Sequence, residues 1–303
     1  MNYKEEIASL AAVSLSQQII DLKQSKQYRI GSKLKIFLEL IKHRKIAQLF
    51  GLIYLSLSRK NATIHSTSSF FERPFVQNYT GRVAVYTCII GIREMIKNPV
   101  FISPNCDYYI ITNKEVPLNS IWKKIDVNDL DIPCKEPNEI NRYIKLHPHL
   151  LFPDYEYSLY IDGNIQIVSD VIPMINQMSP DALIGLHLHD RRRCVFEEAS
   201  TFSYLPRLKK FETLAKIQMD CYKKEGLPKN YGLFENPILI RKHNVSECIE
   251  IMNLWWEQMM LYTMRDQLSL PYVFWKLDIC NDYVHILGEN LRLNPRFIQF
   301  EHD

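Results

Sequence analysis

The residues best suited to bind a ligand or take part in a reaction are Asp162, Gly163 and Asn164. They follow the aromatic and β-branched run Tyr157–Ile161. Such a run is typical of a buried strand. Burying a carboxylate at the end of such a strand costs free energy unless a cation pairs with it. In an open α/β sheet, ligands bind beyond the carboxyl ends of the strands. The side-chain oxygens of Asp162 and Asn164 suit Mg²⁺ or Mn²⁺, which often share ligands with phosphates. The alternative is a plain β-turn, since Asp-Gly-Asn is good turn chemistry.

A basic helix is predicted just upstream, and it carries Arg142 and Lys145. Residues three apart lie on one face of a helix. Arginine offers a planar, bidentate fork and lysine a point charge, so the pair could contact a diphosphate or a sugar hydroxyl. A solvated basic face is the alternative. The position of this helix before Asp162 favours a site that holds the diphosphate of a sugar nucleotide through a divalent metal.

Three further groups of residues could bind a ligand or take part in a reaction. Asp266 and Gln267 begin a predicted helix after Arg265, where an Asp caps the helix or acts near the anomeric carbon of a sugar. The run from His189 to Arg193 lies near two glutamates, and one or two of its arginines could line an anionic pocket. No zinc site is expected, because no cysteine or further histidine has the required spacing.

His302 matters only if the chain end folds back over the site. The chain has no P-loop, no G-x-S-x-G and no strong G-x-G-x-x-G motif.

Composition and charge narrow the class of protein. The chain has 303 residues, 47% hydrophobic and 23% charged, which is globular and not disordered composition. Its net charge of +3 gives no indication of nucleic-acid binding. Residues 1–60 hold eleven Lys or Arg and four Asp or Glu, a net of +7, which leaves −4 for the remainder. Such a basic segment suits an anionic membrane surface, an acidic partner or simply a solvated helical face.

Cysteine usage and the amino terminus indicate the compartment. The seven cysteines are odd in number and form no C-x-x-C pair, which favours reduced thiols in a cytosolic protein. Met1 leads into charged residues and not into the apolar core of a signal peptide. The most apolar run, Ile46–Leu57, is too short to span a bilayer.

The order of predicted elements indicates an α/β fold. Residues 4–20 and 32–57 read as helices, and a boundary is placed near residue 78. Strands and helices then alternate, which predicts a Rossmann-type mixed sheet flanked by helices. The predicted strands cover residues 83–90, 107–112, 122–127, 157–161, 165–168, 182–188 and 237–240. The predicted later helices cover residues 196–224, broken at Pro206, 248–262 and 266–277. Residues 1–78 would form a helical amino-terminal segment and residues 79–303 the main domain.

Several motifs also resemble a known family. RYIKLHPHLLFPDYEYSLYIDGNIQI, from Arg142 to Ile167, resembles the segment through the Asp-x-Asp motif of GT-A glycosyltransferases, especially retaining family-8 enzymes. Asp266-Gln267 resembles their Asp-Gln pair. The wider order of VAVYTCIIG, CDYYIIT, HDRRRCVFEEA, GLFENPILIRKHN and RDQLSLPYVFWK is similar to a glycosyltransferase-like family of bacterial surface-polysaccharide and plant proteins, the TOD1/MUCI70-like family. The likeness covers roughly residues 81–303.

The resemblance implies a GT-A-like fold and a role for each matching residue. A divalent metal, Mn²⁺ or Mg²⁺, would be held by Asp162, Asn164 and His302, with His285 the weaker histidine candidate. The donor nucleotide would contact Tyr86, Thr87, Thr112, Asn113, Arg142, Lys145 and Asp162. Catalysis would involve Arg142, Asp266 and Gln267. An acceptor or sugar pocket would include His189, Arg192, Glu198 and Glu235. One departure is that Asn164 stands where family-8 enzymes have a second acid, which lowers the expected metal affinity.

The resemblance implies a glycosyltransferase, and the cysteine usage favours a cytoplasmic location. The basic amino-terminal segment is compatible with peripheral contact at the inner face of the membrane, among the alternatives given above. The enzyme would transfer a sugar from a nucleotide-sugar donor, expected to be a UDP-sugar, to a hydroxyl of a glycan or lipid-linked acceptor in capsule or lipopolysaccharide synthesis. Two alternatives stay open. One is a nucleotidyl- or phosphotransferase with the same metal–diphosphate chemistry, and the other is a non-catalytic partner that binds sugar nucleotides.

Overall fold

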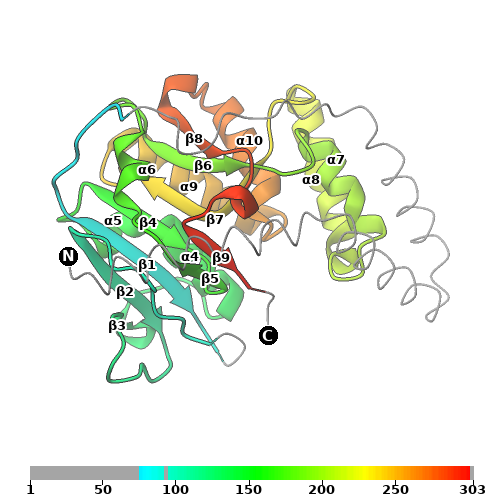
Figure 1. The fold of residues 1–303 in the computed structure, drawn as a ribbon. Helices are drawn as coiled ribbons and strands as arrows, with labels where there is room; N and C mark the ends of the chain where they lie inside the picture. Colours follow the sequence, from blue (N-terminus) through cyan, green and yellow to red (C-terminus); the bar gives the residue numbers. More distant parts are fainter. Residues whose placement is uncertain (1–74, 92–94, 301–303) are drawn as a thin grey trace, which may run out of the picture.

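The fold is built on a seven-stranded sheet (Figure 1). The computed structural model describes residues 75–91 and 95–300, so the helices predicted before residue 58 and His302 lie outside the described residues. The strand order is β3-β2-β1-β4-β7-β6-β8. Its strands are β1 Val83–Ile89, β2 Cys106–Thr112, β3 Lys123–Asp126, β4 Tyr157–Ile161, β6 Ile184–Leu188, β7 Phe234–Arg241 and β8 Val284–Gly288. A separate two-stranded sheet pairs β5 (Ile165–Ile167) with β9 (Phe297–Gln299).

Strand direction brings the predicted site residues to one edge of the large sheet. Strands β1 to β4 run parallel, β7 runs antiparallel to both β4 and β6, and β8 runs parallel to β6. Every strand of this sheet except β7 therefore ends at the same edge. Asp162 follows β4 and His189 follows β6 at that edge.

Two hydrophobic clusters cover the two faces of the sheet, because successive side chains of a strand point to opposite faces. Tyr86 and Cys88 of β1 belong to one cluster, and Val85 and Ile89 belong to the other. The first face packs against helices α4 (Pro137–Leu146), α5 (Pro148–Leu151), α7 (Val195–Ser200), α8 (Glu212–Glu225), α9 (Ser246–Leu261) and α10 (Asp266–Lys276). The second face packs against the β5–β9 pair and helix α6 (Ile172–Asn176). The predicted α/β class, a mixed sheet flanked by helices, is confirmed.

Most predicted elements form close to their expected positions. Strands β1, β2 and β4 and helices α9 and α10 match within a few residues, and residues 196–224 divide around Pro206 into α7 and α8. No described helix is long and apolar enough to cross a membrane.

Two predicted strands form with a partner or with bounds that the sequence did not indicate. Residues 165–167 form β5, close to the predicted 165–168, but the chain turns at Asp162–Asn164 and β5 pairs with β9 outside the large sheet. Strand β7 begins at Phe234 and not at Pro237. Pro237 is tolerated inside β7 because the register with β6 is irregular there, between the pairs His187–Glu235 and Gly185–Ile240.

Buried hydrogen bonds fasten helix α4 to the sheet. The Tyr86 hydroxyl donates to the carbonyl oxygen of Lys145 at 2.9 Å. The Arg241 guanidinium donates to that same carbonyl at 2.6 Å and to the Tyr86 hydroxyl oxygen at 2.5 Å. Asn141 adds a hydrogen bond from its amide to the carbonyl of Cys88 at 2.7 Å. The backbone of α4 is thus fixed relative to β1 and β7.

This network predicts the stability of a conservative variant. Tyr86→Phe should destabilise the protein by about 1–3 kcal/mol, because the buried Arg241 guanidinium loses an acceptor. Urea unfolding should show a lower midpoint with an unchanged slope. Tyr231→Phe is the matched control, since Tyr231 is partly exposed and none of the described residues accepts or donates a hydrogen bond at its hydroxyl. Equal midpoints for the two variants would contradict the proposed anchoring.

Candidate active site

Four charged side chains meet beyond the end of β4. The Lys145 ammonium lies 2.7 Å from Asp266 Oδ2 and 3.7 Å from Asp162 Oδ1. The Arg142 guanidinium lies 3.7 Å from Asp266 Oδ2 and 3.9 Å from Asp162 Oδ1. Arg142 and Lys145 come from α4, Asp162 follows β4, and Asp266 begins α10. The structure therefore brings together the predicted phosphate-binding, metal-binding and catalytic residues in one cluster.

Burial sets the electrostatics of this cluster. The Lys145 side chain is fully buried and Asp266 nearly so. Burial lowers the pKa of Lys145, while Asp162 and Asp266 oppose that shift. Burial alone would raise the pKa of Asp266, but Lys145 and Arg142 outweigh it and hold that pKa well below its usual range. The pKa of Arg142 stays above its usual value, because the two carboxylates outweigh the effect of burial.

Tyr160 orients Asp162, a role that the sequence reasoning missed. The Tyr160 hydroxyl donates to Asp162 Oδ1 at 2.9 Å, and the Lys145 ammonium lies 5.0 Å from the centre of the Tyr160 ring. The spacing of two residues on a strand, which puts Tyr160 and Asp162 on one face, was the available signal.

Asp266 is not a helix cap, which had been the alternative interpretation. The N-cap of α10 is Arg265, and the cap makes no side-chain hydrogen bond. The Asp266 carboxylate instead accepts from Lys145, and the Asp266 carbonyl accepts from the Trp255 indole at 3.1 Å. Gln267 follows at the start of α10, half-buried, and no described residue hydrogen-bonds to its amide. Arg265 likewise makes no ion pair with the described residues, and burial lowers its pKa.

Asn164 is buried and joins the turn to the carboxyl-terminal strand. Its amide nitrogen donates to the Phe300 carbonyl at 2.8 Å, and its backbone carbonyl accepts from Phe300 N at 2.9 Å. Its side-chain oxygen Oδ1 is buried without a hydrogen-bond partner among the described residues. An unpaired buried oxygen beside Asp162 is chemically suited to a cation.

Of the two histidine candidates for a metal site, only His285 lies among the described residues. No group of three or more His, Cys, Asp or Glu side chains is gathered as a metal site within the part of the chain that the structure describes. His285 lies on β8, three strands from β4 and so roughly 14 Å away across the sheet. That distance prevents His285 from sharing a cation with Asp162.

The predicted nucleoside contacts lie at the ends of β1 and β2. Thr112 donates from its hydroxyl to the Ile89 carbonyl at 2.6 Å, and Asn113 Oδ1 accepts from Gly91 N at 3.1 Å. The Thr87 hydroxyl is buried without a partner among the described residues. Tyr86, by contrast, lies in the core beneath α4, where it positions Lys145.

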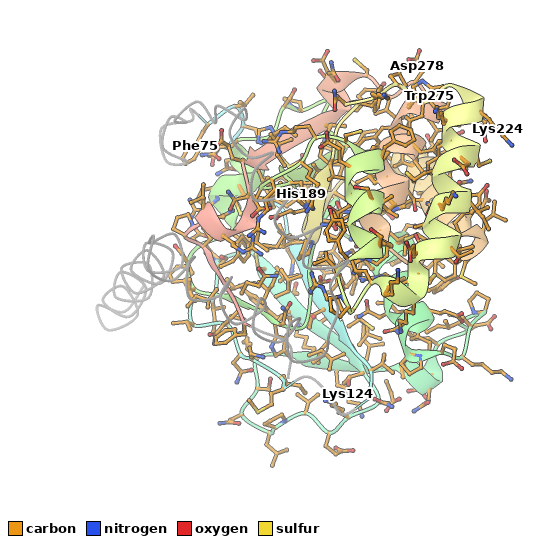
Figure 2. The ribbon with its side chains drawn as sticks, turned by 90° about the vertical axis from the view of Figure 1, so that its right-hand side faces the viewer. Phe75, Lys124, His189, Lys224, Trp275 and Asp278 are labelled. Carbon is orange, nitrogen blue, oxygen red and sulfur yellow. The ribbon has the colours of Figure 1, made fainter. Side chains whose placement is uncertain are left out.

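Three of the four predicted acceptor residues, His189, Arg192 and Glu198, form a second cluster after β6. His189 Nδ1 accepts the backbone amides of Arg191 and Arg192 at 3.1 Å each, and Arg192 pairs with Glu198. Burial lowers the pKa of His189, which agrees with a neutral ring. His189 is buried, and its label lies near the middle of the view in Figure 2.

Glu235 lies at the same edge of the sheet but in different contacts. Its Oε2 accepts from Leu291 N at 2.9 Å. Burial raises the pKa of Glu235.

The Lys145–Asp266 pair predicts how stability depends on pH. Asp266→Asn should cost about 3–5 kcal/mol at pH 7, because it leaves the buried ammonium under-compensated. The depressed pKa of Asp266 contributes stability that is present above about pH 4 and is lost as the pH falls towards the folded-state value. The difference between wild type and variant should therefore shrink in acid. Urea unfolding from pH 7 to pH 3 measures this, with the exposed Glu257→Gln as control. A pH-independent difference would contradict the pairing.

Comparison with known proteins identifies the family. Residues 110–302 match the family model described as the TOD1/MUCI70 glycosyltransferase-like domain. Over 176 residues, 53% of this chain, the sequence is 28% identical to the probable hexosyltransferase MUCI70 of Arabidopsis thaliana, and the match spans 28% of that protein's length.

Two solved structures are also similar. Mouse xyloside xylosyltransferase 1 in its apo form has a TM-score of 0.37 and 10% identity, over 68% of this chain and 84% of that chain. The apo WbbM bifunctional glycosyltransferase has a TM-score of 0.41 and 12% identity, over 93% of this chain and 59% of that chain. The family resemblance predicted from the motifs is confirmed by the family model, and the chain belongs to the TOD1/MUCI70 glycosyltransferase-like domain family.

Proposed function

We propose that this protein is a metal-assisted glycosyltransferase of GT-A type. It transfers a hexose from a nucleotide sugar, in the first instance a UDP-sugar, to a hydroxyl of a growing surface polysaccharide such as capsule or lipopolysaccharide. Family membership supports glycosyl transfer, and the description of the plant relative as a probable hexosyltransferase supports a hexose donor. The observation that carries the proposal is the cluster of Arg142, Lys145, Asp162 and Asp266 at the ligand-binding edge of the sheet.

Charge balance supports a metal in this site. The two cations and two carboxylates of the cluster sum to zero, and Arg265 beside Asp266 adds one positive charge that no described carboxylate pairs with. One positive charge does not balance the two or more negative charges of a diphosphate. A divalent cation would supply that charge, and hard cations are commonly bound by one or two protein oxygens together with substrate phosphates. Asp162 and Asn164 would hold a Mn²⁺ or Mg²⁺ ion, whose chemistry when bound is that of a Lewis acid on the leaving diphosphate. The unpaired Oδ1 of Asn164 fits this role.

The protein's own residues would act by position and charge. As the bond between the anomeric carbon and the diphosphate breaks, negative charge grows on the leaving group. Arg142, which is partly exposed, would donate to that group, and fixed donors stabilise such charge without reorganising. Lys145 is fully buried, so it would act as a positive charge behind Asp162 and Asp266 and not as a direct donor. Tyr160 keeps the carboxylate of Asp162 in one orientation. Asp266 and Gln267 lie at the junction of donor and acceptor, where a carboxylate stabilises positive charge on the anomeric carbon.

Nucleotide binding tests the role of Asp162. A UDP-sugar with manganese, at about a hundred times its dissociation constant, should stabilise the wild type by roughly 2.7 kcal/mol. Asp162→Ala should remain folded and lose the thermal shift, because it removes the carboxylate that meets metal and phosphate. Asp181→Ala is the control, since Asp181 is exposed and its carboxylate has no partner among the described residues. A screen of UDP-, GDP-, CMP- and dTDP-sugars identifies the donor, and an unchanged shift in Asp162→Ala would refute this role.

Metal removal tests the charge-balance argument. EDTA should reduce the nucleotide-induced shift in the wild type, and added Mn²⁺ should restore it, because the neutral cluster alone does not compensate a diphosphate. A shift of equal size with and without chelator would show that Arg142 and Lys145 suffice. Product analysis with a labelled sugar nucleotide separates the reaction classes. Transfer of phosphate or nucleotide in place of sugar would favour the alternative phosphotransferase.

A further inference from the structure

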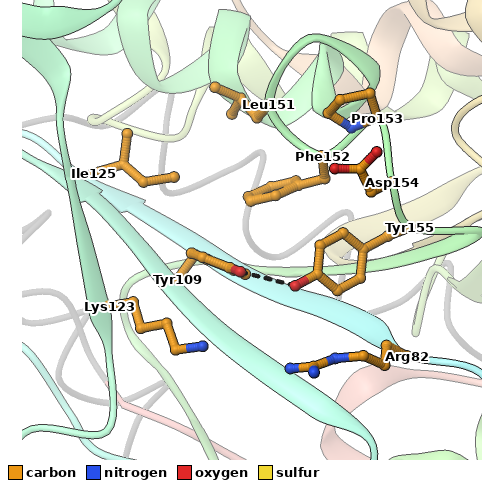
Figure 3. A pocket seen from close by; sticks show the side chains of 9 residues that line it. All are labelled: Arg82, Tyr109, Lys123, Ile125, Leu151, Phe152, Pro153, Asp154 and Tyr155. Carbon is orange, nitrogen blue, oxygen red and sulfur yellow. Dashed lines mark hydrogen bonds between the residues drawn. The ribbon is translucent and has the colours of Figure 1, made fainter.

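A cavity lies on the helix-covered side of the sheet, away from the candidate active site. It is open to solvent and has a volume of about 430 Å³, within the range of about 300–1,000 Å³ that is usual for ligand pockets. Figure 3 shows Tyr109 of β2 and Lys123 of β3 on one side, and the loop before β4 with Phe152, Asp154 and Tyr155 on the other.

The cavity opens at the opposite edge of the sheet from the active site. Tyr155 precedes β4 and Asp162 follows it, and at about 3.3 Å per extended residue the two lie roughly 20 Å apart. A molecule bound here is therefore not in contact with the reacting groups.

Aromatic rings form the apolar part of the lining. The ring centres of Tyr109 and Phe152 lie 5.0 Å apart, and those of Phe152 and Tyr155 lie 6.1 Å apart. The hydroxyls of Tyr109 and Tyr155 are hydrogen-bonded to each other at 2.8 Å, as the dashed line in Figure 3 marks. Phe152 is almost fully buried and packs behind the two tyrosines, so the half-buried rings of Tyr109 and Tyr155 are the ones that offer apolar surface. Such rings have little conformational freedom to lose on binding.

The charged groups at the cavity sum to zero only when Asp154 is counted, and this balance favours a neutral ligand. The Arg82 guanidinium and the Lys123 ammonium both donate to the buried Asp107 carboxylate, at 2.7 Å and 2.8 Å. Burial opposes ionisation of Asp107, but these donors and Tyr155 lower its pKa to about 2. Asp154 adds one negative charge at the mouth, where it is exposed and has no partner among the described residues. Two cations that share one carboxylate leave a net charge of +1, and Asp154 brings the sum over these four described residues to zero. The cavity therefore offers no net positive charge to a phosphate or another anion.

We propose that this cavity is a second carbohydrate-binding site, which takes a neutral sugar unit of a glycan. A pyranose ring has an apolar C–H face, which the aromatic rings would bury, and hydroxyls, which Asp154 and the outer N–H groups of Arg82 and Lys123 would bind. That this glycan is the acceptor rests on the proposed function. The site then anchors a unit of the chain remote from the one being extended.

Saturation-transfer NMR on the full chain tests the inference with three neutral probes, maltohexaose, cellohexaose and mannohexaose. At least one should receive saturation from the wild type. Leu151→Trp should abolish the signal because it fills the cavity that Leu151 lines. Leu150→Trp, its matched control, should not, because Leu150 is exposed and outside the cavity. Asp154→Ala should weaken binding about three- to tenfold, the effect of one lost hydrogen bond, while exposed Asp181→Ala should not.

Several outcomes would overturn the inference: no probe binds, Leu151→Trp binds as the wild type does, or inorganic phosphate displaces the sugar. Asp154→Ala keeps the test valid if the tryptophan variant does not fold. Asp162→Ala separates the two proposals, because it should lose nucleotide binding and keep oligosaccharide binding. A protein that binds nucleotide but no oligosaccharide overturns only this inference. One that binds oligosaccharide but no nucleotide overturns only the proposed function.

Discussion

The fully buried ammonium of Lys145 is the constraint on which the site depends. A charge removed from water must be met by an opposite charge with good geometry. Asp266 meets it at 2.7 Å across 121 positions of sequence. Helix α10 must therefore pack where its first turn reaches α4, and the Trp255 indole holds that turn from α9. One electrostatic requirement thus fixes how the helical layer lies over the end of β4.

The sheet supplies the other half of this positioning. Arg241 of β7 and Tyr86 of β1 hold the Lys145 carbonyl, while the Lys145 side chain reaches Asp266. A single residue of α4 is thus held by the sheet through its backbone and by α10 through its side chain. Sites held in this way by rigid elements keep their geometry better than sites on loops. The resemblance implied that Tyr86 contacts the nucleotide, but its side chain is fully buried and holds the Lys145 backbone beneath the site.

What the sequence predicted followed from local pattern. Strands β1 and β4 could be predicted because a strand that is buried on both faces is a continuous run of hydrophobic residues. Strands β5 and β9 were missed as a pair because each has three residues and they join positions 165 and 299. The sequence indicated that Asp266 begins a helix, but it did not indicate that Lys145 is its partner. No local pattern shows which distant cation will pair with a carboxylate.

The turn Asp162-Gly163-Asn164 shows how a fold can require a departure from a sequence motif. A second carboxylate at position 164 would face the Phe300 carbonyl at hydrogen-bond distance, and two acceptors repel each other. Asn164 instead donates to that carbonyl from its nitrogen and keeps Oδ1 unpaired among the described residues. It also leaves the four-residue charge cluster neutral, where another buried acid would make it negative. The amide therefore joins the turn to the carboxyl-terminal strand while it still offers an oxygen to a cation, at the cost of weaker charge attraction.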